Sequence, residues 1–443
     1  MSRSELAAAC KAKGIKGCGT KKKEELLALL LESVISHVPL EPTKRTALSL
    51  FSGAGGDTFG LEAAGWNVSH YSEFNGPAIK THSTMFPHSK LLTGPSESTD
   101  IKKITDDTFT ALKGKVDLIF AGHPCQGFSH AGKKRADDPR NELVHEFIRA
   151  ARLVQPEWII GENVKGLLSR NGVYPPNTAP RPVIQIIRDL FEAIGYKMTY
   201  RLIDTTEVGV PQLRKRLLYI GHRGDKFPHL PWEKLPRPAA TPTIRHILTP
   251  TLEGAAPFPA LYKPSEQPAR FWIPTTETAP TGTPHPNLVR LVGGIRNLST
   301  KEKTDLGHGP KETVPHEEPE GLVSFGVRKS SYHGQILDPD APSKTIICTY
   351  NQCPRLFVGL YNAAENKYWI RCLTPAECGQ IQGFPADYAW QGANKDKIIQ
   401  IGNAVPPPLA TAVANLIKLA TLKDHSQVCD AEVRAQDTDE EEE

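Results

Sequence analysis

Residues 116–129 read VDLIFAGHPCQGFS, and this stretch decides the fold. Its first five residues are mostly apolar and rich in strand formers, so they predict a short buried strand that ends in a loop. Loops at the carboxyl ends of strands are where open α/β sheets bind ligands and do chemistry. Gly122 allows a close approach of backbone or ligand, and Pro124 stiffens the chain before Cys125. The stretch therefore predicts a cysteine at the tip of a strand-end loop.

The loop after Cys125 is basic, with Lys133, Lys134, Arg135 and Arg140 close to the cysteine in sequence. Nearby positive charge favours the thiolate form, which is the nucleophilic form of cysteine. A single cysteine is also often a small buried hydrophobic residue with no chemical role. The segments on either side of the loop decide between these two interpretations.

The chain has 443 residues, enough for two domains with appendages, and a formal charge of +4. Acidic residues gather at 437–443, so the remainder is more basic than the total indicates and a polyanionic partner is plausible. The eight cysteines show neither a zinc-like CxxC pairing nor a dense disulfide framework, which predicts reduced thiols and no metal. No apolar run approaches membrane-spanning length and no signal peptide is evident, so we expect an intracellular protein.

A strand, a glycine turn and a helix follow one another at the start of the main part of the chain. Residues 46–51 predict the strand, Ser52–Gly56 the turn and 57–64 the helix, an order that forms a cradle for a nucleotide-like ligand. Glu73, about twenty residues on, stands where an acidic side chain can bind ribose hydroxyls. Further on, Asp100 and Ile101 could accept from an adenine amine and pack on its ring. Each segment alone also fits ordinary turn chemistry or surface charge.

Beyond Cys125 the predicted elements are a helix over 142–153, a strand over 158–160, a helix over 183–194 and a strand over 196–202. Glu162 follows the first of these strands, in the same strand-end position as Cys125, although it could instead cap a helix. In the next strand, within 209–220, alternation sends Gln212, Arg214 and Arg216 to one side. Two guanidinium groups on one face could hold a carbonyl or a phosphate.

The domain organisation follows from changes in composition along the chain. Prolines and faint periodicity over 223–341 predict a smaller, loop-rich domain, and the α/β pattern returns at 342–421. Residues 1–35 predict two short helices around a glycine turn, 36–45 a linker and 422–443 a disordered acidic tail. The first segment resembles a SAP-type DNA-binding module, although a helical hairpin with a solvated lysine face fits equally well.

Taken together, the motifs resemble those of the DNA (cytosine-5)-methyltransferases that use S-adenosyl-L-methionine. The resemblance covers about 46–222 and 342–420 and rests on the following segments: Phe51–Gly56, Glu73, Asp100-Ile101, Pro124-Cys125-Gln126, Glu162-Asn163-Val164, Gln212–Arg216, Arg371–Pro385 and Gly402–Pro406. It implies a Rossmann-like α/β methyltransferase domain with the domain 223–341 inserted for target recognition. His123 stands where many members have proline, and we expect this difference to have little effect.

The resemblance also implies the roles of individual residues. Cys125 would attack carbon 6 of a flipped-out cytosine, Glu162 would contact ring nitrogen 3 and the exocyclic amine, and Arg214 and Arg216 would hold the ring carbonyl. The implied cofactor-binding residues are Phe51, Gly53, Gly55, Glu73, Phe74, Asp100, Ile101, Pro124, Asn403 and Val405. The implied contacts to double-stranded DNA are Gln126, Ser129, Arg140 and Gln212, the first three in a loop that closes over the base.

Two other functions stay open at this point. One is a tRNA cytosine-5 methyltransferase of the related RNA-modifying branch, against which stands the lack of a Cys-Phe-Thr signature in the insert. The other is a catalytically silent DNA-binding relative, against which stands the joint retention of Cys125, Glu162, Arg214 and Arg216. The SAP-like start and acidic tail point to a nuclear location if the source is a eukaryote. The target sequence and the oligomeric state do not follow from the sequence.

Overall fold

The structure is a computed structural model that describes residues 22, 45–124, 143–173, 179–224, 230–258, 287–289, 294–295, 334–350 and 356–421. The chain divides into two units, residues 1–44 and 45–443, and all elements below belong to the second. The predicted SAP-like module apart from Lys22, the acidic tail, and Cys125, Gln126, Ser129 and Arg140 lie outside the described residues. What the sequence predicts for them stays a prediction.

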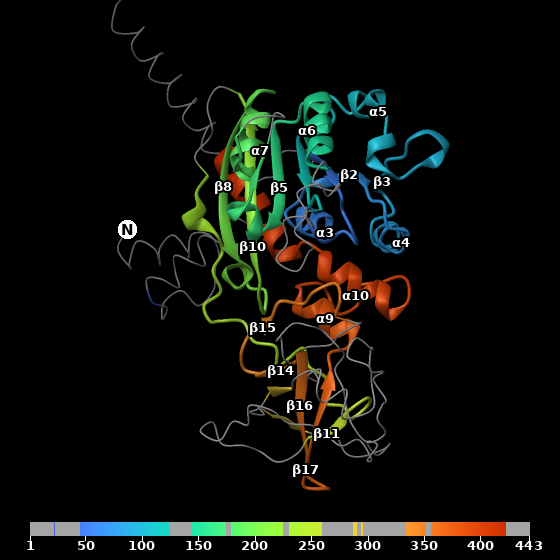
Figure 1. Ribbon diagram of the computed structural model, residues 1–443, viewed down its shortest axis with the longest axis vertical. Coiled ribbons are helices and arrows are strands. Elements are labelled where there is room, and N and C mark those ends of the chain that lie inside the picture. Colours follow the sequence, from blue (N-terminus) through green and yellow to red (C-terminus); the bar gives the residue numbers. More distant parts are fainter. Residues whose placement is uncertain are drawn as a thin grey trace, which may run out of the picture. The chain divides into compact units, whose positions relative to one another are not determined.

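A seven-stranded sheet forms the centre of the described part of this second unit. Its strands run, in spatial order, as β3 (Lys90–Leu91), β2 (Asn67–Ser72), β1 (Thr46–Leu50), β4 (Leu118–Ala121), β5 (Trp158–Val164), β10 (Lys215–Arg223) and β8 (Tyr196–Asp204). The first five are mutually parallel, and β10 is antiparallel to both of its neighbours. The predicted Rossmann-like α/β fold is confirmed (Figure 1).

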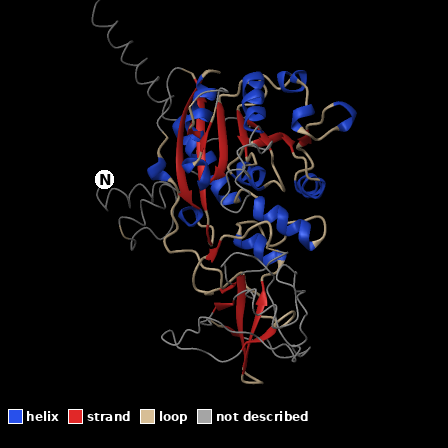
Figure 2. Cartoon of the chain, viewed as in Figure 1, coloured by secondary structure: helices blue, strands red, loops and turns tan. Residues whose placement is uncertain are grey.

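Helices cover both faces of this sheet, so its central strands are buried and mostly apolar (Figure 2). The helices in this part of the chain are α3 (Gly56–Ala63), α4 (Gly76–Met85), α5 (Asp106–Thr110), α6 (Leu143–Val154) and α7 (Val183–Glu192). On α6 and α7 the buried side chains recur three and four residues apart, so each helix presents one apolar stripe to the sheet. Phe147 and Phe191 from these stripes meet edge to face, 5.0 Å between ring centroids.

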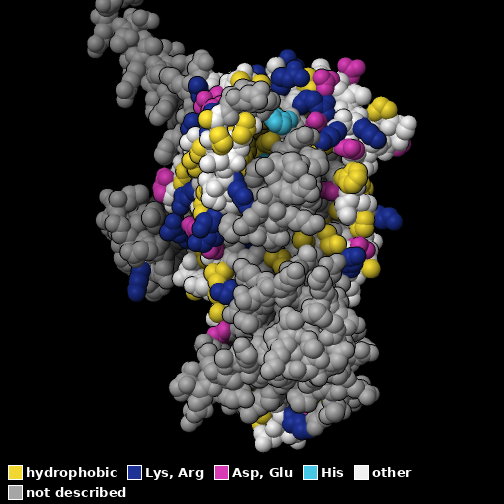
Figure 3. Space-filling model, in the orientation of Figure 1, with side chains coloured by type: hydrophobic (Ala, Val, Ile, Leu, Met, Phe, Trp, Pro, Cys, Tyr) yellow, Lys and Arg dark blue, Asp and Glu magenta, His cyan; other side chains and the backbone are white. Residues whose placement is uncertain are grey.

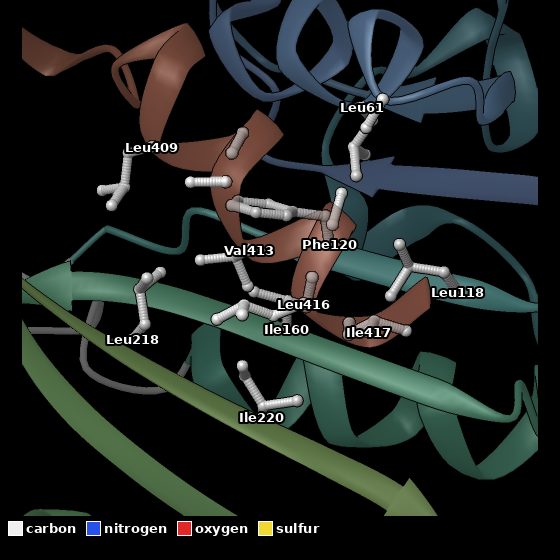
Figure 4. Close-up of a cluster of buried hydrophobic side chains, with 14 of the residues drawn as sticks. Leu61, Leu118, Phe120, Ile160, Leu218, Ile220, Leu409, Val413, Leu416 and Ile417 are labelled. Atoms are coloured by element: carbon white, nitrogen blue, oxygen red, sulfur yellow. The ribbon is translucent and has the colours of Figure 1, made fainter. Parts of the chain in front are cut away.

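A helix over residues 407–421 packs against the opposite face of the sheet (Figure 4). Leu409, Val413, Leu416 and Ile417 of this helix join Leu61 of α3 and the strand residues Leu118, Phe120, Ile160, Leu218 and Ile220 in one buried cluster. The helix over 407–421, near the carboxyl terminus, therefore shares one hydrophobic core with α3 and the strands of the sheet. Without this helix, that face of β4, β5 and β10 would be exposed to water.

A second sheet contains β11 (Ala256–Phe258), β17 (Lys367–Cys372), β16 (Leu356–Asn362), β14 (Gly334–Ile336) and β13 (Gly294–Ile295) in that order, with β12 (Asn287–Leu288) on β16. The sequence prediction assigned β16 and β17 to the closing part of the catalytic domain, but both pair with strands from the insert. The two strands form an antiparallel hairpin, and the unpaired N–H and C=O groups along its two outer edges pair with strands of the insert. The inserted domain and its boundaries remain proposals.

Two helices follow this sheet, α9 (Pro375–Ile381) and α10 (Asn394–Asn403). A capping box between Thr374 and Glu377 begins α9, as the Leu-Thr-Pro sequence predicts. Two short pairings complete the description: β9 (Gln212–Leu213) with β15 (Ser343–Lys344), and β6 (Asn171–Gly172) with β7 (Arg181–Pro182). On the face drawn in Figure 3, Lys and Arg side chains are interspersed with Asp and Glu.

Candidate functional site

The predicted site residues come from successive strand ends that lie at one edge of the seven-stranded sheet. Leu50 at the end of β1 is paired with Ser72 of β2 and with Ala121 of β4, and Ala121 is paired with Gly161 of β5. The segments that follow these residues therefore leave the sheet side by side. This brings the glycine turn, Glu73, the His123-Pro124 segment and Glu162 to the same edge.

The glycine turn after β1 has backbone angles that favour glycine at two positions. Gly53 and Gly55 have φ values of +58° and +89°. A Cβ at Gly55 would lie 2.5 Å from the Phe86 ring, so this position also lacks the space for a side chain. A Cβ at Gly53 would meet nothing within 4 Å, so the turn faces open space there. Phe51, with φ +57°, begins this left-handed turn.

Glu73 is fixed by three backbone hydrogen bonds. Its carboxylate accepts from the N–H groups of Gly53 at 2.8 Å, Phe74 at 2.9 Å and Asn75 at 2.7 Å. Burial raises the pKa of this carboxyl group, and the three N–H groups oppose that rise. Phe74, the next residue, has a side chain that is 73% exposed. A fixed acceptor for hydroxyl groups thus stands beside an exposed aromatic ring and the open turn at Gly53.

Asp100 and Ile101 lie beyond β3, at the start of the 3-10 helix η2 (Ile101–Lys103). Asp100 caps this helix by accepting from the N–H of Lys102 at 3.1 Å. The Ile101 side chain is 6% exposed and packs in the core, so only a small part of it is open to a ligand. The Ile101 carbonyl is also used, because it accepts from Arg149 at 2.9 Å.

Val405, in the carboxyl-terminal part of the chain, contacts the segments that follow β1 and β4. Its carbonyl oxygen is 2.1 Å from the point where a Cβ at Gly56 would lie, and its side chain is 3.4 Å from that point at Gly122. Val405 thus packs closely against the helix start after β1 and the segment after β4. Asn403, at the end of α10, is exposed. Of these two predicted residues, Val405 is packed inside the protein and Asn403 is open to solvent.

Glu162 forms a buried ion pair with Arg216, with 2.8 Å between Oε1 and Nε. Strand β5 continues through Glu162, so the alternative interpretation of this residue as a helix cap is wrong. Burial raises the pKa of the carboxyl group, while the charges of Arg216 and Arg214 act in the opposite direction. The result is a carboxyl group whose protonation depends on a balance of two opposing effects.

Arg214 and Gln212 bond to segments far along the chain, whereas Arg216 pairs with Glu162. The strand is broken at Arg214, between β9 and β10, so the period of two is interrupted. The Arg214 guanidinium donates to the carbonyl groups of Ile346, Gly402 and Ala404, at 3.1, 2.9 and 3.3 Å. Arg214 therefore links the backbone near 346 to the backbone at 402–404. Its Nε is buried without a partner among the described residues.

Gln212, predicted as a DNA contact, is instead fully buried. Its Nε2 donates to Gln382 Oε1 at 2.6 Å, and its Oε1 accepts from the N–H of Ile346 at 3.0 Å. In this structure the amide is buried and bonded inside the protein at both ends, so it does not face a base or a phosphate.

His123 is buried beside the site, with partners on two neighbouring strands that the sequence does not reveal. It is 5% exposed, its Nε2 lies 2.7 Å from the Tyr219 hydroxyl, and Asn163 Nδ2 lies 3.3 Å from its carbonyl oxygen. Burial lowers the pKa of the imidazole to about 4, so the ring is neutral at neutral pH. The sequence signal for His123 is the histidine itself, at a position where many members of the resembled family have proline.

Within the described ranges, no group of three or more His, Cys, Asp and Glu side chains is placed to hold a metal ion. None of the helices in those ranges has the length and apolar character that crossing a membrane requires.

Comparison with known proteins gives a family match and several relatives. The family described as C-5 cytosine-specific DNA methylase matches residues 46–419. The type II methyltransferase M1.HphI of Haemophilus parahaemolyticus is 30% identical over 380 residues, which cover 84% of this chain and 86% of the relative. The type II methyltransferase M.PspPI of Psychrobacter sp. (strain TA137) is 30% identical over 405 residues, 89% and 84% of the two chains.

Solved structures share the fold at lower identity. A putative DNA modification methyltransferase encoded within an E. coli prophage superposes with a TM-score of 0.52 at 20% identity, covering 85% of this chain and 99% of the other. A mutant of DNMT2 from Spodoptera frugiperda gives a TM-score of 0.53 at 17% identity, with coverage of 85% and 100%. At these identities the likeness concerns the arrangement of the elements alone.

Proposed function

Because the chain belongs to the C-5 cytosine-specific DNA methylase family, we propose that it methylates a cytosine flipped out of double-stranded DNA, through a covalent bond to Cys125. It is an S-adenosyl-L-methionine-dependent DNA (cytosine-5)-methyltransferase. The observation that carries the mechanism is the Glu162–Arg216 pair at the sheet edge. The His123-Pro124 segment, which leads directly into Cys125, leaves the sheet from the neighbouring strand β4.

The reaction needs a nucleophile because carbon 5 of cytosine reacts poorly with an electrophile until carbon 6 carries a substituent. The Cys125 thiolate bonds to carbon 6, and the electrons of the carbon 5–carbon 6 double bond become available at carbon 5. When bound, S-adenosyl-L-methionine supplies an electrophilic methyl group. After carbon 5 carries the methyl group, loss of its proton to a base returns the electrons, restores the double bond and releases the Cys125 thiolate.

Glu162 and Arg216 stabilise the base while its charge changes. Glu162 Oε1 is held by Arg216 Nε, and hydrogen bonds from a carboxyl group to ring nitrogen 3 and the exocyclic amine orient the ring. The raised pKa of Glu162 favours a carboxyl group that can share a proton with the ring nitrogen. Arg216 is the guanidinium assigned to the ring carbonyl, because Arg214 is bonded to three backbone carbonyl groups.

The residues around the glycine turn fit the cofactor. The three N–H groups on Glu73 aim its carboxylate, which suits the two hydroxyl groups of a ribose. Phe74 offers an exposed ring to the adenine, and the open space at Gly53 admits the ligand to the backbone. The set assigned to the cofactor is completed by Phe51, Gly55, Asp100, Ile101, Pro124, Asn403 and Val405.

The remaining assignments concern recognition of the DNA. The domain 223–341, with β16 and β17 added to its sheet, is assigned to target recognition, and the loop 126–140 to closure over the base. Residues 1–35 are assigned to DNA binding as a SAP-like module. A nuclear location, if the source is a eukaryote, is part of this proposal and rests on that module and the acidic tail.

A covalent-trapping experiment tests the mechanism. DNA containing 5-fluorocytosine cannot lose a proton from carbon 5, so the enzyme should stay bonded to it in the presence of S-adenosyl-L-methionine. We expect the adduct with the natural protein and with Cys372→Ala, and none with Cys125→Ala. Cys372 is the matched control because burial raises the pKa of its thiol to about 11, which keeps it protonated. An adduct in Cys125→Ala would refute the assignment of the nucleophile.

The substrate class is tested by transfer of labelled methyl groups to unmethylated DNA, hemimethylated DNA and tRNA, followed by mapping of the modified base. Label at one recurring DNA sequence supports the proposal and reads out the specificity of the inserted domain. Label in tRNA alone would contradict the proposed substrate. Deletion of residues 1–35 should weaken DNA binding without stopping transfer, and an unchanged affinity and salt dependence would refute the role of that module.

A further inference from the structure

The glycine turn after β1 is held by hydrogen bonds from two different parts of the chain. The N–H groups of Phe51 and Ser52 donate to Ser72 of β2, to its hydroxyl group at 3.2 Å and to its carbonyl oxygen at 3.0 Å. The N–H of Gly53 donates to Glu73, the residue that follows β2, at 2.8 Å. The strand next to β1 therefore fixes the first half of the turn.

Tyr388, between α9 and α10, holds the second half of the turn. Its hydroxyl group donates to the Ala54 carbonyl oxygen at 2.5 Å, and both residues are buried. The N–H of Gly55, at the other end of the same peptide group, donates to the Ser52 carbonyl at 2.9 Å. Both polar atoms of this peptide group are thus bonded. Glycine adopts many backbone conformations, so a turn with glycine at 53 and 55 depends on such bonds to keep one shape.

Gln391, three residues after Tyr388, contacts the helix that follows Glu73. Its N–H donates to the hydroxyl group of Thr81 on α4 at 2.9 Å. That hydroxyl group donates to Gln400 of α10 at 2.6 Å, and the Gln400 amide donates back to the Gln391 carbonyl at 2.9 Å. Thr81 is fully buried within this ring of bonds. Helices α4 and α10 are thereby joined side by side (Figure 1).

Aromatic packing fixes the Tyr388 ring independently of its hydroxyl group. The centroid of the ring lies 4.7 Å from those of Phe384 and Trp390, and 6.3 Å from that of Phe59 on α3. Tyr388→Phe keeps an aromatic ring for all three contacts. The substitution therefore removes the hydrogen bond to the turn and preserves the packing.

We propose that Tyr388 is a positioning residue for S-adenosyl-L-methionine, and that residues 388–391 hold the glycine turn and α4 in the arrangement that binds the cofactor. The inference rests on the proposed function, in which the turn and Glu73 bind this cofactor. Tyr388 acts through the backbone of the turn. Thr81 acts through α4, which is capped by Asn75, a residue whose N–H also donates to Glu73. A site ordered before binding loses less backbone entropy when the cofactor arrives.

Calorimetric titration of S-adenosyl-L-methionine into the full chain tests the role of Tyr388. The Kd should rise about fivefold in Tyr388→Phe, because one orienting hydrogen bond is lost. Tyr196→Phe is the matched control, because its buried hydroxyl group donates to the Pro156 carbonyl at 2.7 Å, at the opposite end of the strands. Each substitution removes a buried donor to a carbonyl group, so both should lower the free energy of unfolding to a similar extent. A purely structural role of Tyr388 predicts the same Kd in both variants.

Steady-state kinetics add a second readout for Tyr388→Phe. With saturating cofactor, kcat and the KM for DNA should stay within about twofold of the natural protein, while the KM for the cofactor rises with the Kd. A lower kcat with an unchanged Kd would place the effect in the chemical step and overturn the proposal.

Two substitutions at Thr81 test the contact to α4. Thr81→Val removes the hydroxyl group at similar shape, whereas Thr81→Ser keeps it. We expect the Kd for S-adenosyl-L-methionine to rise about threefold in Thr81→Val and to be largely restored in Thr81→Ser. Equal Kd values in the two variants would show that the bonds among Thr81, Gln391 and Gln400 do not position the cofactor site.

Glu73→Gln separates this inference from the proposed function. The substitution removes the charge of the carboxylate assigned to the ribose and should raise the Kd at least about tenfold. If Glu73→Gln binds the cofactor as the natural protein does, the proposed cofactor site is wrong. If Glu73→Gln binds it weakly but Tyr388→Phe behaves like Tyr196→Phe, the positioning role of Tyr388 fails and the cofactor site stands.

Discussion

Replacement of Asp57 by Asn should stabilise the protein more at high pH than at low pH. Asp57 is the second residue of α3, directly after the glycine turn, and is 1% exposed. Its carboxylate accepts from the hydroxyl groups of Ser49 and Ser52. Burial outweighs these hydrogen bonds and raises the pKa of Asp57 from 3.8 to about 6. Asp57 thus lies next to the glycine turn, in buried surroundings that favour the protonated carboxyl group.

The magnitude follows from the difference between folded and unfolded pKa values. Well below pH 3.8 both states are protonated, and the carboxyl group imposes no penalty. As the pH rises toward 6 the unfolded chain loses the proton while the folded protein keeps it, so the free energy of unfolding falls by about 1.4 kcal/mol per pH unit. Above pH 6 the loss levels off at about 3 kcal/mol. Asparagine does not titrate, so the free energy of unfolding of the variant does not fall in this way as the pH rises.

The assay is the free energy of unfolding of the natural protein and of Asp57→Asn at pH 5 and pH 8. The advantage of the variant should grow by about 1.4 kcal/mol over this interval, whatever constant offset the changed hydrogen bonds introduce. Asp107→Asn is the control, because Asp107 stands in the first turn of α5 with its side chain exposed. An advantage of Asp57→Asn that stays the same or shrinks between pH 5 and pH 8 would show that the burial argument is wrong.

Three further predictions follow from the same geometry. Glu162→Gln removes the ionisable proton beside the base and should lower single-turnover methyl transfer at least about a hundredfold, with S-adenosyl-L-methionine binding by calorimetry unchanged; full activity would exclude its assigned role. Gly60→Ala places a Cβ 2.4 Å from the Pro407 carbonyl oxygen and should lower the free energy of unfolding by about 2 kcal/mol. Gly76→Ala is the control: its Cβ would meet nothing within 4 Å, so the free energy of unfolding should change little. Equal effects of the two substitutions would contradict the packing argument. Phe74→Ala should raise the Kd for S-adenosyl-L-methionine about tenfold through loss of the exposed ring, and an unchanged Kd would remove Phe74 from the cofactor site.

Much of the fold could be predicted because its signals are local. The apolar runs at 46–51, 116–120 and 158–160 contributed to β1, β4 and β5, since strands buried on both faces are mostly apolar. The glycine turn and the strand-end position of Glu73 follow from short sequence patterns and from the shared carboxyl edge of parallel strands. The position of Glu162 at this edge was predictable for the same reason, although β5 continues two residues past it.

The contacts that could not be predicted join residues far apart in the chain. Arg214 bonds to carbonyl groups at 346, 402 and 404, and Gln212 bonds to Gln382. No local pattern reveals a partner more than a hundred residues away, and the alternation of a strand says nothing of such partners. The contact of His123 with Tyr219, 96 positions away, is of the same kind.

The electrostatics of the site depend on this long-range network as well as on the local motifs. Arg214 donates to three carbonyl groups, which prevents its guanidinium from moving toward a ligand, yet its charge still acts on Glu162. Arg216 has a different arrangement, because its Nε pairs with Glu162 while one of its terminal nitrogens donates to the adjacent Lys215 carbonyl. One guanidinium is therefore a fixed source of positive potential, and the other holds the carboxyl group in place before the base arrives. Such an arrangement needs little reorganisation when charge develops on the cytosine ring, which is the condition for electrostatic stabilisation of a transition state. Arg214 also ties the backbone at Gly402 and Ala404, next to the residues proposed to bind the cofactor, to the strand that carries Arg216.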